Sequence, residues 1–252
     1  MLKTRVMPVV LLTGYNVVKG IQFGTYRTLG NPITVSKVYD GRLVDELILL
    51  DIRASQEKRG PRLDIISDIA SECFMPLTIG GGIKSLDQAR EVIRRGADKV
   101  AINSGALERP GLIKEISNEF GAQCVVVSID VKENDQGEKF VFSNSGKSFT
   151  RWKADDWAEE VQNMGAGEIL LNSVDRDGKM TGYDLSIIQE VKKRISIPLI
   201  VCGGAGEPKD CYEAIQIGGA DAVAAASMFH FTSITPRIVK EYLQEHGIPT
   251  RL

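Results

Sequence analysis

The sequence predicts a single (β/α)₈ barrel spanning residues 1–252, and three observations support this fold class. The chain has 252 residues, of which 43% are hydrophobic. That is enough for one large core, and α/β barrels often reach this length as one domain. Short apolar runs alternate with longer stretches of helical periodicity, as in βα units around a parallel sheet. The second half of the chain also repeats the first, which indicates a fold built from two equivalent halves.

Eight short apolar runs are predicted to be the strands, and eight parallel strands joined by helices close into a barrel. In chain order they are Arg5–Leu11, Glu46–Asp51, Pro76–Ile79, Lys99–Ile102, Cys124–Asp130, Glu168–Asn172, Pro198–Cys202 and Ala222–Ala225. Helices are expected between them, for example over Ser85–Arg95 and Lys153–Met164.

The internal repeat divides the predicted barrel into half-barrels at about residues 1–121 and 122–252. The segment PLTIGGGIKSLDQAREVIRRGADKVAINS, from Pro76, matches PLIVCGGAGEPKDCYEAIQIGGADAVAAAS, from Pro198. VDELILL in the first half likewise matches AGEILLN in the second. The same alignment pairs VMPVVL with VVVSID, so Leu11 and Asp130 should occupy equivalent strand ends.

Composition excludes several classes of function. The formal net charge of -2 gives no basic field, which argues against a nucleic-acid partner. The apolar run near the N-terminus has only six residues, and no other segment approaches a spanning length, so we expect no membrane partner and a cytoplasmic location.

Cysteine and histidine give no sign of a metal or cofactor. The four cysteines, Cys73, Cys124, Cys202 and Cys211, lack any CxxC spacing, which argues against a zinc site and a disulfide framework. The two histidines, His230 and His246, have no second ligand at metal spacing and no nucleophile signature beside them. Carboxylates must therefore carry any chemistry, and we expect no metal and no cofactor.

Glycine and small polar residues follow the predicted strands at the end where barrel enzymes bind their ligands. Glycine lets bare backbone N–H groups approach an anion. One glycine pair would be a weak signal, but the pairs recur at matching strand ends, which favours two cradles and a ligand with two phosphates. These residues are Gly80–Gly82, Asn103, Ser104, Asp177, Gly178, Gly203, Gly204, Ala226 and Ser227.

Two aspartates end strands, and a lysine lies near them. Asp130 ends the fifth strand, where a carboxylate can act as general acid or base. Asp51 ends the second strand, and for this residue a structural role in an ion pair or loop cap is as good an interpretation as a role in acid–base chemistry. Lys19 is expected in a long first loop, residues 17–32, that could close over a ligand. The first strand ends in a wholly apolar run that contains Leu11.

Four charged residues begin strands at the opposite end of the predicted barrel: Arg5, Glu46, Lys99 and Glu168. For any one of them, a solvated rim or a structural salt bridge would suffice. Two charges of each sign together could form a ring across the barrel floor, and such a ring could serve as a plug or gate.

These features together resemble HisF, the cyclase subunit of imidazole glycerol phosphate synthase, over almost the whole chain. The resemblance rests on a highly specific set of motifs: VVKG from Val17, DELILLDI from Asp45, GGGI from Gly80, RGADKVAINS from Arg95, GAGEILLNSVDRDG from Gly165, CGGAG from Cys202 and FHF from Phe229. It implies a partner glutaminase, HisH, docked on the N-terminal face of the barrel. It also implies that ammonia crosses the barrel to react with a bisphosphorylated nucleotide at the other face.

The resemblance assigns roles to individual positions. It places the ammonia gate at Arg5, Glu46, Lys99 and Glu168, the glutaminase contacts at Asp98 and Gln123, and the phosphate-binding positions at Lys19, Gly82, Asn103, Ser104, Asp177, Gly178, Gly204, Ala226 and Ser227. Asp130 matches one of two catalytic aspartates, but the other falls on Leu11. A threonine typical of the sixth strand is Asn172 here, and a serine of the seventh is Cys202.

Three hypotheses follow. The loss of an aspartate at Leu11 resembles the WbuZ branch of HisF-like proteins, which implies a barrel that relays ammonia from a HisH-like glutaminase to a sugar amidotransferase, for acetamidino-sugar formation in surface polysaccharides. We favour this hypothesis at the level of sequence. The alternatives are an ordinary cyclase of histidine biosynthesis, in which Asp130 alone suffices, and a non-catalytic barrel that binds a phosphorylated ligand.

Overall fold

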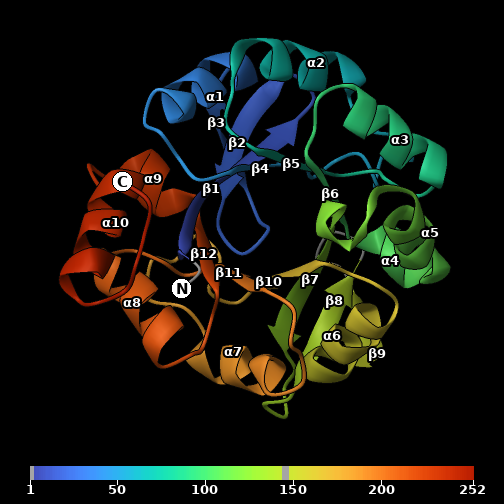
Figure 1. Cartoon of the computed structure of the whole chain (residues 1–252). Coiled ribbons are helices and arrows are strands. Elements are labelled where there is room, and N and C mark those ends of the chain that lie inside the picture. The colour runs from blue at the N-terminus through green and yellow to red at the C-terminus, as the bar shows by residue number, and fades with distance from the viewer. Residues whose placement is uncertain (1–2, 144–147) are drawn as a thin grey trace.

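A computed structural model, which describes residues 3–143 and 148–252, shows a closed barrel of parallel strands with helices around the outside (Figure 1). Each barrel strand pairs in parallel with the next, and β12 pairs with β1 to close the ring. The predicted (β/α)₈ fold is therefore confirmed. The barrel strands are β1 (Arg5–Thr13), β4 (Leu47–Asp51), β5 (Leu77–Gly80), β6 (Lys99–Ile102), β7 (Val125–Glu133), β10 (Glu168–Ser173), β11 (Leu199–Cys202) and β12 (Ala222–Ala225).

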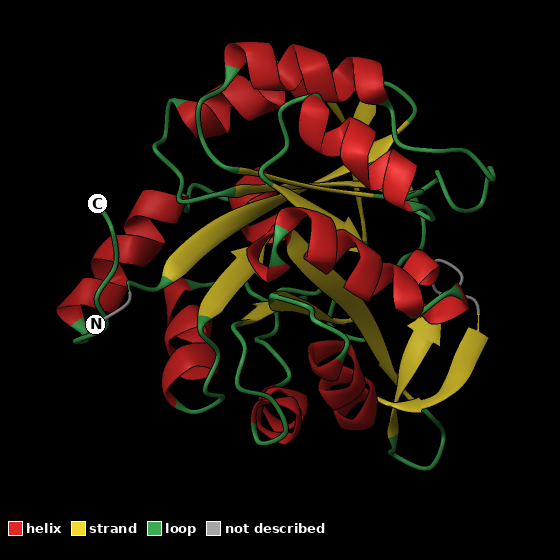
Figure 2. Ribbon diagram, turned by 45° about the vertical axis from the view of Figure 1, so that its right-hand side comes forward, coloured by secondary structure: helices red, strands yellow, loops and turns green. Residues whose placement is uncertain are grey.

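The helices surround the barrel, as both ribbon views show (Figures 1 and 2). The two helices expected by range are present as α3 and α6, each one residue shorter at both ends because the outermost residues are caps. Ser85, for example, accepts a hydrogen bond from the backbone N–H of Gln88. The helices are α1 (Pro32–Asp40), α2 (Leu63–Glu72), α3 (Leu86–Arg94), α4 (Ser104–Glu108), α5 (Gly111–Phe120), the 3₁₀ turn η1 (Ala122–Cys124), α6 (Ala154–Asn163), α7 (Leu185–Lys192), α8 (Pro208–Gln216), α9 (Ser227–Phe231) and α10 (Pro236–Glu245).

Two hairpins at the C-terminal face correct the sequence-based expectation. The first loop is largely strand: β2 (Asn16–Gly20) pairs antiparallel with β1, and β3 (Tyr26–Gly30) pairs with β2. A second hairpin, β8 (Lys139–Ser143) and β9 (Ser148–Lys153), extends from the long end of β7. Local sequence did not indicate these strands because their pairing partners are the overlong ends of β1 and β7.

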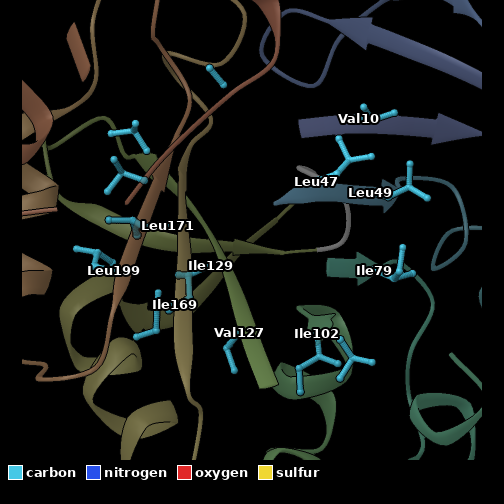
Figure 3. Close-up of a cluster of buried hydrophobic side chains, with 14 of the residues drawn as sticks. Val10, Leu47, Leu49, Ile79, Ile102, Val127, Ile129, Ile169, Leu171 and Leu199 are labelled. Atoms are coloured by element: carbon cyan, nitrogen blue, oxygen red, sulfur yellow. The ribbon is translucent and has the colours of Figure 1, made fainter. Parts of the chain in front are cut away.

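The core has two layers separated by the strands, because successive side chains on a strand point to opposite faces. The outer layer lies between strands and helices and includes Val127, Ile129 and Leu171 (Figure 3). The inner layer fills the barrel with Met7, Val9, Ile48, Ala101, Val126, Leu170, Ile200, Ala222, Ala224 and Ala226.

The same alternation links the two ends of the barrel interior. On β10, Glu168 lies at the start, Leu170 is in the inner core, and Asn172 lines a pocket at the far end. Lys99, Ala101 and Asn103 repeat this order along and just beyond β6. Four residues of strand span about 13 Å. The charged floor and the pocket are therefore the two ends of one column of inward side chains.

Candidate active site

A pocket opens at the C-terminal ends of the strands, where the fold class places ligand sites. Its polar lining includes Asp130, Asn103 and Asn172, and its apolar lining includes Leu11 and Leu50. The first hairpin contributes Lys19, Phe23 and Tyr26 to the rim. The full lining is Val9, Leu11, Lys19, Phe23, Tyr26, Leu50, Asp51, Ile52, Ser55, Gly81, Gly82, Ile83, Ala101, Ile102, Asn103, Ser104, Gly105, Ser128, Asp130, Leu170, Asn172, Asp177, Cys202 and Ala226.

Asp130 lies at the centre of the polar side and is held by two side-chain amides. Asn103 Nδ2 donates to Asp130 Oδ2 at 2.7 Å, and Asn172 Nδ2 donates to Oδ1 at 3.0 Å. Burial raises the pKa of Asp130 to about 6; the two amide donors act in the opposite direction, and the charge of Asp177 adds to the rise. A carboxyl group with a pKa close to neutrality suits general acid–base chemistry.

This raised pKa predicts a pH-dependent stability difference. The unfolded chain releases the Asp130 proton near pH 4 and the folded chain near pH 6. Folded stability should therefore be highest below pH 4 with respect to this group and should fall as the pH rises to 6. We expect Asp130→Asn to be more stable than the original chain at pH 8, by about 1–3 kcal/mol. Urea unfolding measures the gain, which should vanish near pH 3.5. An equal gain at both pH values would contradict the assignment.

The other two carboxylates of the pocket are neutralised by cations. Arg59 binds Asp51 with both terminal nitrogens, at 2.6 and 3.0 Å. Asp51 also accepts hydrogen bonds from the loop backbone, so the structure supports the ion-paired, loop-capping interpretation of this residue. Lys19 Nζ lies 2.7 Å from Asp177 Oδ1, and both side chains are buried. Lys19 lies on strand β2 and not in an irregular loop, and it forms an ion pair with Asp177.

Leu11 lies on the strand that faces Asp130 across the ring. In the order of the barrel strands β1 is the first and β7 the fifth of eight, so they are diametrically opposed. Leu11 packs against the inner core together with Leu50 and Cys202. The wall opposite Asp130 is therefore apolar, and it offers no proton-transfer group at this position.

The structure brings only part of the predicted phosphate positions into the pocket. The positions that line it are Lys19, Gly82, Asn103, Ser104, Asp177 and Ala226, whereas Gly178, Gly204 and Ser227 lie outside its lining. The backbone at Gly82 and Gly178 has φ of 76° and 75°, which disfavours other residues. A Cβ would also come within 2.6 Å of a neighbouring carbonyl oxygen at either position. Close loop packing thus accounts for these glycines without a ligand, and their role in binding phosphate stays a prediction.

The four floor residues form one cluster of ion pairs. Arg5 contacts Glu46 and Glu168, each at 2.9 Å, and Lys99 contacts the same two residues at 2.8 and 3.0 Å. Thr78, on β5, donates to Glu46 as well. Burial opposes the charge of Arg5, but Glu168 and Glu46 outweigh it and raise its pKa. The ring across the barrel floor is therefore present, and its function as a gate stays a prediction.

Removing one cation from this ring should be costly. Lys99→Met leaves Glu46 and Glu168, which are 3% and 12% exposed at their side chains, with Arg5 as the remaining basic partner of the ring. We expect a loss of about 2–3 kcal/mol in the free energy of unfolding, because a buried charge loses its partner. Lys99→Met combined with Glu168→Gln is the matched control and should recover part of the loss. Full stability of the single variant would show that the ring is energetically unimportant.

The N-terminal face carries Asp98 and Gln123, both exposed and both just before a barrel strand. Asp98 also has a structural task, since its carboxylate accepts the backbone N–H of Leu77 at 2.8 Å. Asp221 does the same for Leu199 in the other half-barrel. The same contact in both half-barrels gives Asp98 a structural role that does not depend on a partner.

Comparison with known proteins identifies the family. The family described as "Histidine biosynthesis protein" matches residues 5–235. The chain belongs to this family. HisF proteins are among its relatives: the imidazole glycerol phosphate synthase subunits HisF of Dictyoglomus thermophilum and Chlorobium limicola are each 46% identical over 252 residues, and that of Lysinibacillus sphaericus is 43% identical over 253. Each alignment covers all of this chain and all of the relative.

Sequence reasoning about this HisF-like chain missed two apolar side chains on the N-terminal face. Phe74 is 91% exposed and Leu43 is 76% exposed. They precede neighbouring strands β5 and β4, and both contact Asp40: the N–H of Phe74 donates to its side chain and that of Leu43 to its carbonyl oxygen. Single apolar residues in loops are ordinary, so the sequence contained no signal for them. Their shared position became evident only in three dimensions.

Among residues 3–143 and 148–252, no group of three histidine, cysteine or acidic side chains is placed to hold a metal ion. Within the same described ranges, no helix has both the length and the apolar character needed to cross a membrane.

Proposed function

We propose that this chain is the ammonia-accepting subunit of a glutamine-dependent synthase of the cytoplasm. In this proposal, ammonia enters at the N-terminal face, passes the ring of Arg5, Glu46, Lys99 and Glu168, and reaches a phosphorylated ligand in the pocket. The observation that carries the proposal is the inner column of side chains, which has a charged ring at one end and the Asp130 pocket at the other.

The chemistry of the column suits neutral ammonia. Between the ring and the pocket the inner layer is mostly apolar, and several of its side chains are small: Ala101, Ala222 and Ala224 lie beside Ile48 and Leu170. Thr78 on β5 and Ser128 on β7 add buried hydroxyl groups. Transfer of an ammonium ion from water into such surroundings would cost many kcal/mol. Transfer of neutral ammonia costs only the free energy of the hydrogen bonds that it loses to water. The barrel interior therefore favours ammonia over ammonium, and it would keep the ammonia from being protonated in solvent.

The partner that this chemistry requires is a glutaminase of the HisH type, because free ammonia is scarce at neutral pH. The exposed side chains of Phe74 and Leu43 lie beside the charged ring, which is the proposed entrance. Leu43 is three residues before Glu46 of the ring. Phe74 is four residues before Thr78, which donates a hydrogen bond to the same glutamate. Exposed aromatic side chains are common anchors of protein interfaces. We infer that the glutaminase covers this face, with Asp98 and Gln123 at the same surface, and seals the entrance.

For the reaction itself, the comparisons favour the cyclase of imidazole glycerol phosphate synthase over sugar amidation. The full-length relatives carry that name, and at 43–46% identity they match this chain end to end. In this function Asp130 would move the proton during ring closure, and the pocket would hold a bisphosphorylated nucleotide. The hypothesis that we favoured from sequence, sugar amidation beside a sugar amidotransferase, is therefore the second candidate.

One specific observation supports the second candidate function, ammonia relay for sugar amidation. Among the described residues, Asp130 is the pocket carboxylate without a cationic partner, and the apolar Leu11 occupies the opposite strand. A reaction that needs two proton-transfer groups therefore lacks one of them. Leu11 also prolongs the apolar stripe of Met7 and Val9 to the pocket. Such a barrel would suit the passage of ammonia to a further acceptor, as in acetamidino-sugar formation.

A reconstitution separates the proposals. The chain is mixed with a HisH-type glutaminase, and co-elution and glutamine hydrolysis are measured; co-elution with stimulated hydrolysis supports the proposed subunit role. The bisphosphorylated nucleotide is then added with glutamine or with ammonium at alkaline pH. Product in both assays supports the cyclase, and coupled ammonia release without product supports the relay. Ligand binding without any effect on the glutaminase would leave the non-catalytic barrel and refute the subunit role.

A further inference from the structure

The three carboxylates that line the pocket have different kinds of partner. Asp51 is paired with Arg59 and Asp177 with Lys19, so each of these charges is balanced by a cation. Asp130 is bonded only to the neutral amides of Asn103 and Asn172 among the described residues. Its negative charge is therefore stabilised by hydrogen bonds but not cancelled.

The position of Asn172 follows from strand register. Asn172, on β10, is the direct partner of Asp130 on β7 and of Cys202 on β11. It therefore lies between the two, and its amide nitrogen reaches the carboxylate at 3.0 Å. Its carbonyl oxygen is buried and has no hydrogen-bond partner among the described residues. It faces Gly203, where a Cβ would approach to 2.9 Å, so a larger residue there would displace the amide.

We propose that Asn172 is a positioning residue for Asp130, and that with Asn103 it forms a neutral amide clamp that keeps this carboxylate ionised, oriented and uncompensated in the pocket. Each amide occupies one carboxylate oxygen, which fixes the plane of the group. Asp130 also lines the pocket, so its remaining lone pairs can accept from a bound ligand. A cation in place of Asn172 would hold the charge more firmly but would cancel it, so the clamp preserves an acceptor for an N–H or O–H donor, or for a proton, of the bound ligand.

The charged surroundings of Asp130 are few, so the effect of the clamp can be isolated. In the described part of the chain, Asp177, in the loop after β10, is the charged group that acts on Asp130, and it is itself paired with Lys19 from β2. Hydrogen bonds to an ionised carboxylate lower its pKa. Loss of the Asn172 donor should therefore raise the pKa of Asp130 above about 6.

The test is a titration that needs no substrate. The chain is labelled with ¹³C at the aspartate carboxyl groups, and the Asp130 signal is identified by its loss in Asp130→Asn. In Asn172→Leu, which is nearly isosteric and has no N–H, we expect the midpoint to rise by about one pH unit. Asn103→Leu should give a similar rise. Asn163→Leu is the matched control: it makes the same substitution at an exposed position at the end of α6, away from the pocket, and the midpoint should stay where it is in the original chain.

A second measurement covers the case in which Asn172→Leu fails to fold. In the unaltered chain the side-chain N–H protons of Asn172 should shift with pH at the same midpoint as the Asp130 carboxyl carbon. A folded Asn172→Leu that titrates like the original chain, or Asn172 protons that ignore the Asp130 transition, would overturn the clamp. The proposal concerns the pocket of the proposed function, but this result is independent of any turnover, so the two can fail separately.

Discussion

Replacing Leu11 with aspartate is expected to raise ammonium-dependent turnover of the bisphosphorylated nucleotide by on the order of 10²-fold. The reason is geometric: β1 and β7 are opposite strands of the ring, so the new carboxylate would face Asp130 across the pocket. Ring closure and bond cleavage both require proton transfer, and two groups on opposite sides can serve both steps. Steady-state rates at alkaline pH, without glutaminase, measure the change.

Two controls define what this result would mean. Leu11→Asn has a similar shape and polarity but exchanges no proton, so it should leave turnover unchanged. Asp130→Asn should lower any turnover by roughly 10²-fold or more, in the original chain and in Leu11→Asp alike. If the unaltered chain already turns over at about 1 s⁻¹ or faster, and Leu11→Asp adds nothing, then Leu11 does not limit the reaction and the relay function is refuted.

Replacing Phe74 with glutamate is expected to weaken binding of a HisH-type glutaminase by about 30-fold or more. Phe74 is 91% exposed in the isolated chain, so its side chain loses no internal packing when it is changed. If the glutaminase covers this face as proposed, a glutamate there would place an unpaired charge in the interface. Titration calorimetry of the two purified proteins measures the affinity, and the thermal stability of the barrel alone should change little.

Ile21→Glu is the matched control for this prediction. Ile21 is also a large exposed apolar residue, at 58%, but it lies in the turn of the first hairpin, at the opposite face of the barrel. Its replacement should leave the glutaminase affinity unchanged. Equal affinity of the Phe74→Glu variant would show that the glutaminase, if it binds, does not use this part of the N-terminal face. Asp98 is a poorer choice for such a test, because a change there would also remove the hydrogen bond to Leu77.

Much of the barrel was predictable because its signals are local and repeated. Short apolar runs that alternate with helical stretches, together with the repeat of the first half of the chain in the second, were sufficient to predict eight parallel strands, and β6 and β12 have the expected bounds. The predicted strand bounds likewise placed Glu46, Lys99 and Glu168 at one end of the barrel and Asp130 at the other. Position along a strand determines which end a residue occupies, so a one-dimensional pattern is enough.

Other features of the site were decided only by the tertiary structure, because they depend on residues that are distant in the chain. The sequence could not choose between a free and a paired Asp51, and its pairing with Arg59 depends on how the following loop folds back. Nor could it show that Asn172 and Asn103, 69 residues apart, bind the two oxygens of one carboxylate. The exposure of Phe74 and the strand pairing of the first loop were hidden for the same reason. Periodicity determines which face of a strand a residue occupies, whereas hydrogen bonds, ion pairs and exposure depend on which other segments reach that face, and that is decided by closure of the barrel.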